Sequence, residues 1–121
     1  MLQIDRYSRT PIYEQVISQI EEMIARGLFS PGDLLPSVRS LSQELNVNPN
    51  TLQKAYAELE RKGLCISAPG SGRFIAKDAR RILVESKKGR LEELTQLVRE
   101  LKDAGVGYEE IIKCVKNAFE D

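Results

Sequence analysis

Polar side chains that can form hydrogen bonds and ion pairs follow Pro49 directly: Asn50, Thr51, Gln53 and Lys54. Side-chain amides donate and accept paired hydrogen bonds, and lysine adds a positive charge, so this set suits recognition of a polar, anionic partner. The chain has no histidine, which removes Ser-His-Asp and Cys-His arrangements and the commonest metal ligand. We therefore expect no catalytic residues, no metal and no cofactor. A small enzyme built on paired carboxylates is the alternative.

Composition sets wider limits. The 121 residues carry 18 basic and 18 acidic side chains, so net charge indicates no particular partner. No apolar run approaches the roughly 20 residues of a membrane helix, and the start of the chain lacks a signal-peptide pattern; we expect a cytoplasmic protein. Cys65 and Cys114 belong to no CxxC pair, which argues against a zinc ribbon. We expect both to be reduced and buried, and a redox role of Cys65 stays open.

Three helices must position the polar set. Thr10-Pro11 predicts the start of the first helix, which ends at Gly27. Ser37 is the expected N-cap of a second, short helix. Asn48 followed by Pro49 predicts the start of a third, because proline suits the first helical position. This third helix should end near Gly63.

The third helix has two distinct faces. Its apolar face consists of Leu52, Ala55, Tyr56 and Leu59, and its outer face of Asn50, Gln53, Lys54, Ala57 and Arg61. A short helix, a tight turn and a helix with such an outer face describe a helix-turn-helix. An ordinary pair of packed helices is the alternative at this point.

The stretch 63–77 favours the helix-turn-helix over an ordinary pair of packed helices. Its apolar residues alternate around Pro69-Gly70-Ser71-Gly72, which predicts a β-hairpin with a glycine-rich tip and Arg73 at its base. A hairpin directly after a helix-turn-helix forms a wing, which can approach DNA phosphates or the minor groove. Residues 34–77 also hold six basic and three acidic side chains, a modest surplus of the sign that DNA attracts.

These motifs together resemble the winged-helix domain of GntR-family bacterial transcription regulators. The resemblance covers residues 11–76 and rests on GDLLPSVRSL, VNPNTLQKAYAELE, KGL and GSGRFIA in combination. The NPNT segment and the short C-terminal part resemble the YtrA-type branch of the family. The resemblance implies a DNA-binding regulator and suggests that it controls a transporter operon.

The family's DNA contacts transfer only to matching positions. The resemblance implies contacts from Arg39, from Asn50, Thr51 and Gln53, and from the wing-tip glycine, Gly70. Many relatives carry guanine-reading arginines where this chain has Pro49 and Gln53, so that readout is absent. From geometry, Gln53 would favour adenine, with about 1–3 kcal/mol of discrimination for a good bidentate pair. We expect Lys54, Arg61 and Arg73 to contact phosphates.

Residues 79–121 form a separate region, so we expect domains at 1–78 and 79–121. Leu91, Leu94, Val98 and Leu101 form a short heptad-like seam, and a second stripe contains Ile111, Ile112, Val115 and Phe119. Two helices this small cannot bury both stripes by themselves. We expect a second copy to cover them, as the resemblance also implies; folding back onto the winged helix is the alternative.

The expected fold is therefore mainly α with a small β wing: a winged helix-turn-helix domain plus a C-terminal two-helix dimerisation hairpin. The expected function is that of a homodimeric repressor that binds a palindromic operator; the sequence leaves open whether an effector modulates DNA binding. The alternative is a winged-helix protein-interaction module without DNA readout. The two differ in whether alanine at Gln53 or Lys54 changes DNA binding.

Overall fold

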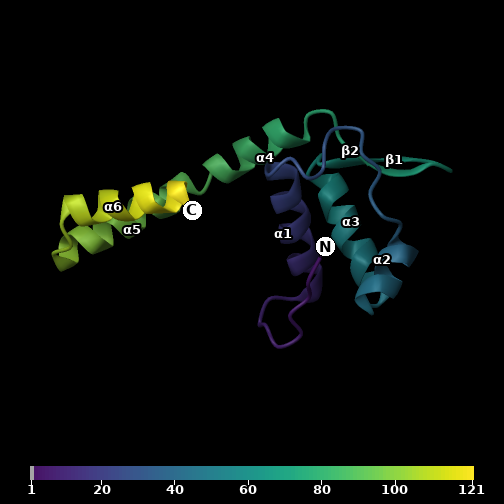
Figure 1. The fold of residues 1–121 in the computed structure, drawn as a ribbon, viewed down its shortest axis with the longest axis horizontal. Helices are drawn as coiled ribbons and strands as arrows, with labels where there is room; N and C mark the ends of the chain where they lie inside the picture. The colour runs from purple at the N-terminus through teal and green to yellow at the C-terminus, as the bar shows by residue number, and fades with distance from the viewer. Residues whose placement is uncertain (1) are drawn as a thin grey trace. The chain divides into compact units, whose positions relative to one another are not determined.

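The computed structural model describes residues 2–121 and divides the chain into two compact units, between Glu85 and Ser86. Figure 1 shows the elements in order. They are α1 (Ile12–Ala25), α2 (Val38–Leu45), α3 (Pro49–Arg61), β1 (Cys65–Ala68), β2 (Gly72–Ile75), α4 (Ala79–Lys88), α5 (Leu91–Ala104) and α6 (Tyr108–Glu120). The predicted fold class, mainly helical with a small two-stranded sheet, is confirmed.

The core of the first unit lies between α1, α3 and the sheet. Leu52, Ala55, Tyr56 and Leu59 of α3 are all buried, as the spacing predicted. They pack in one cluster with the apolar face of α1, on which Val16 is fully buried. The outer face of α3 is thereby left to polar side chains.

The turn between α2 and α3 follows the sequence signals closely. The Ser37 hydroxyl accepts a hydrogen bond from the Ser40 amide at 3.0 Å, which confirms Ser37 as the N-cap of α2. Asn46 ends α2 in the left-handed conformation, φ 53°, which asparagine tolerates better than most residues. The Asn48 side chain then accepts from the Asn50 amide at 2.8 Å and caps α3, with Pro49 as its first residue.

The start of α1 differs from the prediction by one residue. Pro11 is the N-cap, and no side chain caps this helix. The Thr10 carbonyl instead accepts a hydrogen bond from the Gln15 side chain at 2.8 Å. Gln15 also exchanges hydrogen bonds with the backbone of Asp5, so a long-range contact replaces the local cap.

The wing is an antiparallel hairpin whose register pairs Cys65 with Ile75 and Ala68 with Gly72. The segment before α2 runs along its other edge. The Leu35 amide donates to the Arg73 carbonyl at 2.8 Å, and Leu34 forms a bridge with Phe74. The base of the wing is therefore attached to the chain that leads into α2.

α4 spans the division between the two units. The sequence placed a domain boundary after residue 78, whereas the compact first unit extends to Glu85. The difference has a physical reason, since Ala79 and Leu83 are buried in the core of the first unit.

The second unit contains α5 and α6, joined by a turn at Gly105, whose φ is 102°. Neither helix has a buried residue. The Gly89-Arg90 pair separates α4 from α5. Among residues 2–121, no helix combines the length and the apolar character that crossing a membrane requires.

Candidate nucleic-acid interface

The outer face of α3 presents the side chains that the sequence singled out. Asn50, Gln53, Lys54 and Arg61 are exposed, and Thr51 is half-buried. Because Asn48 and Pro49 fix the beginning of the helix, Asn50 and Gln53 lie in and just after its first turn. Amide groups at that position can reach base edges when the helix enters a major groove.

Other predicted contact residues lie outside α3, on α2 and on the wing. Arg39 lies in the first turn of α2 and is exposed. Gly70 is exposed at the wing tip with φ 78°, a conformation that side chains other than glycine rarely adopt. Arg73, on β2, is half-buried, and its guanidinium lies 5.5 Å from the centroid of the Tyr56 ring.

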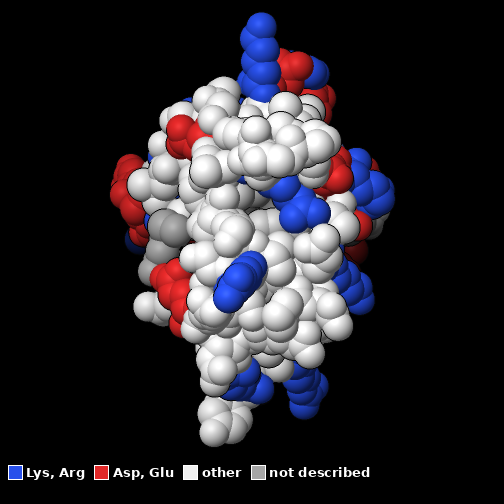
Figure 2. Space-filling view, turned by 90° about the vertical axis from the view of Figure 1, so that its right-hand side faces the viewer, with Lys and Arg blue, Asp and Glu red and all other residues white. Residues whose placement is uncertain are grey.

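Basic side chains are distributed over this region. Figure 2 views the molecule from the right-hand side of Figure 1, where the wing and α2 are drawn. Lys and Arg side chains stand in the middle and at the lower edge of that face, whereas the Asp and Glu in view lie mainly toward its margins. Such a distribution favours a polyanionic partner although the chain as a whole is neutral.

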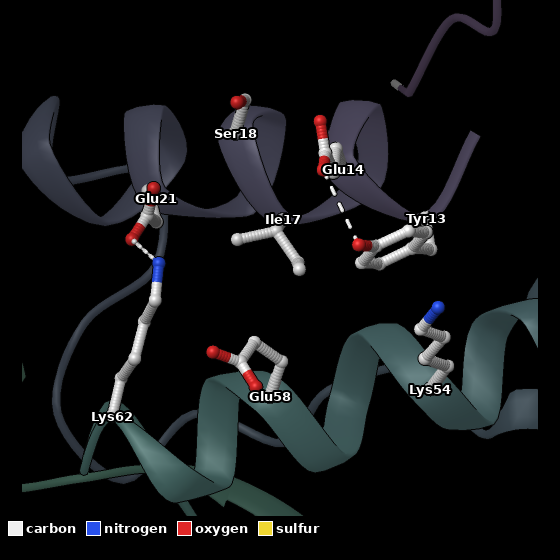
Figure 3. Close-up of a pocket in the computed structure, with 8 residues that line it drawn as sticks. All are labelled: Tyr13, Glu14, Ile17, Ser18, Glu21, Lys54, Glu58 and Lys62. Atoms are coloured by element: carbon white, nitrogen blue, oxygen red, sulfur yellow. Dashed lines mark hydrogen bonds and ion pairs between the residues drawn. The ribbon is translucent and has the colours of Figure 1, made fainter. Parts of the chain in front are cut away.

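Lys54 is directed toward α1. Its Nζ lies 3.9 Å from the centroid of the Tyr13 ring, and Figure 3 shows both residues in a groove of about 440 Å³ between α1 and α3. The Tyr13 hydroxyl donates to Glu14 at 3.2 Å, and this hydrogen bond raises the pKa of Tyr13. A phosphate that bound Lys54 would have to replace the contact of this lysine with the Tyr13 ring.

Arg61 has an intramolecular partner as well. Its Nε donates to both carboxylate oxygens of Glu58, at 3.0 and 2.9 Å. These hydrogen bonds hold the pKa of the Glu58 carboxyl below its usual value, so Glu58 is ionised at neutral pH. DNA phosphates would therefore compete with Glu58 for this arginine.

The same groove contains an ion pair that joins α1 to the end of α3. Lys62 Nζ lies 3.2 Å from the carboxylate of Glu21, whose side chain is only 8% exposed. Both partners are visible at one end of the groove in Figure 3. This pair fixes the helix that carries the polar face against the helix behind it.

Arg6 contributes in a way that the sequence analysis missed. Its Nη2 donates to the carbonyls of Leu45 at 3.0 Å and Asn46 at 2.8 Å, the last groups of α2. A cation at a helix C-terminus satisfies carbonyls that have no partner within the helix. Nothing in the spacing indicates this contact, because Arg6 precedes its acceptors by 39 and 40 residues.

Metal ligands and cysteines are the remaining candidates for chemistry. Among the described residues no group of three or more His, Cys, Asp or Glu side chains is placed to hold a metal. Cys65 is buried, and burial raises the pKa of its thiol to about 11. Cys114 was expected to be buried too, but it is exposed, because it lies on α6, which buries no residue.

Comparison with known proteins places the chain in a family. The model of the bacterial regulatory proteins of the gntR family matches residues 12–75, from α1 to the end of the wing. The chain belongs to the GntR family. The members of this family are transcription regulators, not enzymes, and their helix-turn-helix domain binds DNA.

Individual relatives agree with this assignment. The chain is 44% identical to the HTH-type transcriptional repressor YtrA of Bacillus subtilis (strain 168), over all of this chain and 94% of that protein. It is 35% identical to the structure of a GntR family transcriptional regulator from Listeria monocytogenes, with a TM-score of 0.75, covering 94% of this chain and 98% of the other. The resemblance to the YtrA-type branch is thus confirmed.

Some of the solved relatives include operator DNA. AraR(DBD) in complex with operator ORX1 matches 62% of this chain and 93% of the other chain, at 32% identity and a TM-score of 0.56. The match extends over about the length of the first unit. The DNA contacts assigned to individual side chains of this protein stay predictions.

Proposed function

We propose that this GntR-family regulator is a homodimeric repressor that binds a palindromic operator through α3 and the wing. The observation that supports it most directly is the capped start of α3, which leaves Asn50 and Gln53 exposed at the beginning of the helix. The relative YtrA is named a repressor, and AraR(DBD) was solved in complex with an operator.

Base readout and backbone contact have different sources in this proposal. Asn50, Thr51 and Gln53 read base edges, with Gln53 paired to adenine. Arg39, Lys54, Arg61 and Arg73 contact phosphates, and the wing-tip Gly70 lets the backbone come close to the duplex. Lys54 and Arg61 exchange their partners Tyr13 and Glu58 for phosphates on binding.

The second unit provides the dimer contact. Leu91, Leu94 and Phe119 are 59%, 46% and 89% exposed, although the helices that carry them are amphipathic. A two-fold dimer would cover these stripes and present two copies of α3 to half-sites about one helical turn of DNA apart, or a multiple of it. The residues assigned to the contact are Leu91, Leu94, Val98, Leu101, Ile111, Ile112, Val115 and Phe119. Leu97, 52% exposed, joins them, since its spacing to Leu94 and Leu101 also fits a helical stripe.

The location of this regulator in the cell follows from its DNA target. A repressor of a bacterial promoter works in the cytoplasm, where the chromosomal DNA is. The resemblance to the YtrA-type branch suggests a transporter operon as the controlled gene set.

Selection of bound sequences from a random duplex pool, at about 150 mM salt because affinity depends on it, tests the proposal. We expect a palindromic motif with two half-sites. Gln53→Ala should lose the preference at one base per half-site, and Gln43→Ala, an exposed glutamine on α2, should keep the motif. A pool without an enriched motif would contradict DNA readout and favour a protein-interaction module.

A further inference from the structure

A second cavity lies on the wing side of α3, opposite the groove shared with α1. Its volume is about 290 Å³, and it is lined by the segment before α2, by α3 and by the wing. The polar side chains among its lining residues are those of Ser37, Gln53, Tyr56, Ser71 and Arg73. We refer to this cavity as the wing cleft.

Arg73 is the only charged residue among those that line the wing cleft within the described chain. Its Nε is buried and has no hydrogen-bond partner among residues 2–121. Arginine carries five donors and no acceptor, and a buried donor without a partner is destabilising. An acceptor that reaches this nitrogen on binding would remove that penalty.

Tyr56 holds this arginine in place. Its side chain is 1% exposed, so the ring is fixed in the core, and its hydroxyl donates to the Pro36 carbonyl at 2.7 Å. Burial raises the pKa of Tyr56 to about 12, so the hydroxyl keeps its proton at neutral pH. The Arg73 guanidinium rests 5.5 Å from the centroid of this ring, a contact that orients the cation without neutralising it.

The charge of the wing cleft distinguishes it from the groove on the other side of α3. That groove is lined by Glu14, Glu21 and Glu58 as well as by two lysines, and its lysines already have partners there. The wing cleft has a cation and, among its lining residues, no carboxylate. An anion would therefore be attracted to the wing cleft and not to the groove.

We propose that the wing cleft seats one phosphate of the DNA backbone, which accepts hydrogen bonds from Arg73, and that Tyr56 is the positioning residue for that arginine. The proposal rests on the proposed DNA binding and specifies one contact within it. The occupant is a backbone phosphate and not a free anion, because Gln53 of α3 and Ser71 of the wing border the cleft. These two elements would flank a bound duplex.

Salt dependence of DNA affinity tests the proposal, since each neutralised phosphate adds about 0.9 to the slope of log K against log salt. Binding of one fixed duplex by the full chain is measured by fluorescence anisotropy over a salt series. We expect Arg73→Gln to weaken binding at least about tenfold and to reduce the slope by about one. Arg26→Gln is the matched control, since this exposed arginine pairs with Glu22 on α1; it should leave slope and affinity unchanged.

The role of Tyr56 has its own readout. Tyr56→Phe keeps the ring under Arg73 and loses only the hydroxyl, so we expect the full slope with a loss of affinity below about threefold. Tyr56→Leu removes the ring. It should reduce the slope of log K against log salt as much as Arg73→Gln does, although Arg73 is still present. Thermal melting shows whether Tyr56→Leu is folded. If it is not, the single variants Tyr56→Phe and Arg73→Lys provide the test instead. Arg73→Lys should keep the slope, because it keeps the charge, and lose affinity.

The outcomes separate the proposal from the function on which it rests. If the parent protein binds DNA and Arg73→Gln keeps its slope, the phosphate contact is overturned while DNA binding stands. If the parent binds no duplex, the function and the contact fail together. Titration with inorganic phosphate, followed through the Nε–H NMR signal of Arg73, should show no saturation below about 10 mM. Saturation with an unchanged DNA slope in Arg73→Gln would make the cleft a free-anion site and overturn the proposal.

Discussion

The helices of the two units are built from similar patterns but reach different environments. α3 has 13 residues, of which Leu52, Ala55, Tyr56 and Leu59 are buried, whereas α5, with 14 residues, and α6, with 13, bury none. All three are amphipathic. The apolar face of α3 packs against α1 and the sheet within its own unit, whereas the apolar residues of α5 and α6 are exposed or at most half-buried.

This contrast shows that an amphipathic pattern indicates a buried face without saying which surface buries it. Full burial of a leucine side chain contributes roughly 1.5–3 kcal/mol, so the first unit has internal sources of stability that the second, with half-buried residues only, has to a smaller extent. In our proposal the second unit gains stability by burying its apolar residues against a second copy of the chain. Paired substitutions, one in each unit, test this difference between the units.

The largest expected difference concerns leucine truncation. Leu52→Ala removes a fully buried side chain and should lower the free energy of unfolding of the first unit by about 2–5 kcal/mol. Leu97→Ala, in which the same atoms are removed from a side chain that is 52% exposed, should leave that transition unchanged. Urea unfolding monitored by circular dichroism measures both. Equal losses would contradict the contrast between the units.

An intermediate effect is expected on self-association. Leu94→Asp places a charge on the exposed face of α5 and should raise the dimer dissociation constant at least about a hundredfold, because a buried unpaired charge is strongly unfavourable. Leu28→Asp, at a leucine that is 66% exposed in the first unit, is the control and should leave it unchanged. Sedimentation equilibrium gives both constants. A parent protein that stays monomeric at all concentrations would refute the proposed dimer.

The smallest expected effect concerns a helix cap. Asn48→Ala removes the acceptor for the Asn50 amide and should destabilise the first unit by about 1 kcal/mol. Asn117→Ala replaces an exposed asparagine within α6, where alanine is the better helix former, and should cause no loss. Chemical unfolding of the two variants beside the parent resolves the difference. A larger loss for Asn117→Ala would mean that α6 is packed more closely than its exposure indicates.

Sequence signals were sufficient where the interactions are local. The caps at Ser37 and Asn48 join residues two or three positions apart, and the wing turn joins residues that are close in the chain. Period-3.6 spacing likewise identified the buried face of α3. These features depend on backbone geometry that a short segment determines largely by itself.

Other features depend on contacts between distant segments and could not be predicted. Lys54 was expected to face phosphates, and only the packing of α1 against α3 brings it to Tyr13. Thr10 has the right type for a cap, yet Gln15 binds its carbonyl. The burial of Ala79 and Leu83 depends on the three-dimensional core. For the proposed interface, the sequence predicted the exposed residues of α3, but not the partners that some of them already have.

The contact of Arg6 with the end of α2 has a practical consequence for assays. Two hydrogen bonds connect Arg6 to the turn that precedes α3, so a fluorophore attached at the neighbouring position of Tyr7, which is exposed, would lie close to that turn. We expect such a label to alter the measured affinity for DNA. Competition with unlabelled protein, or a dye carried on the duplex, avoids this bias.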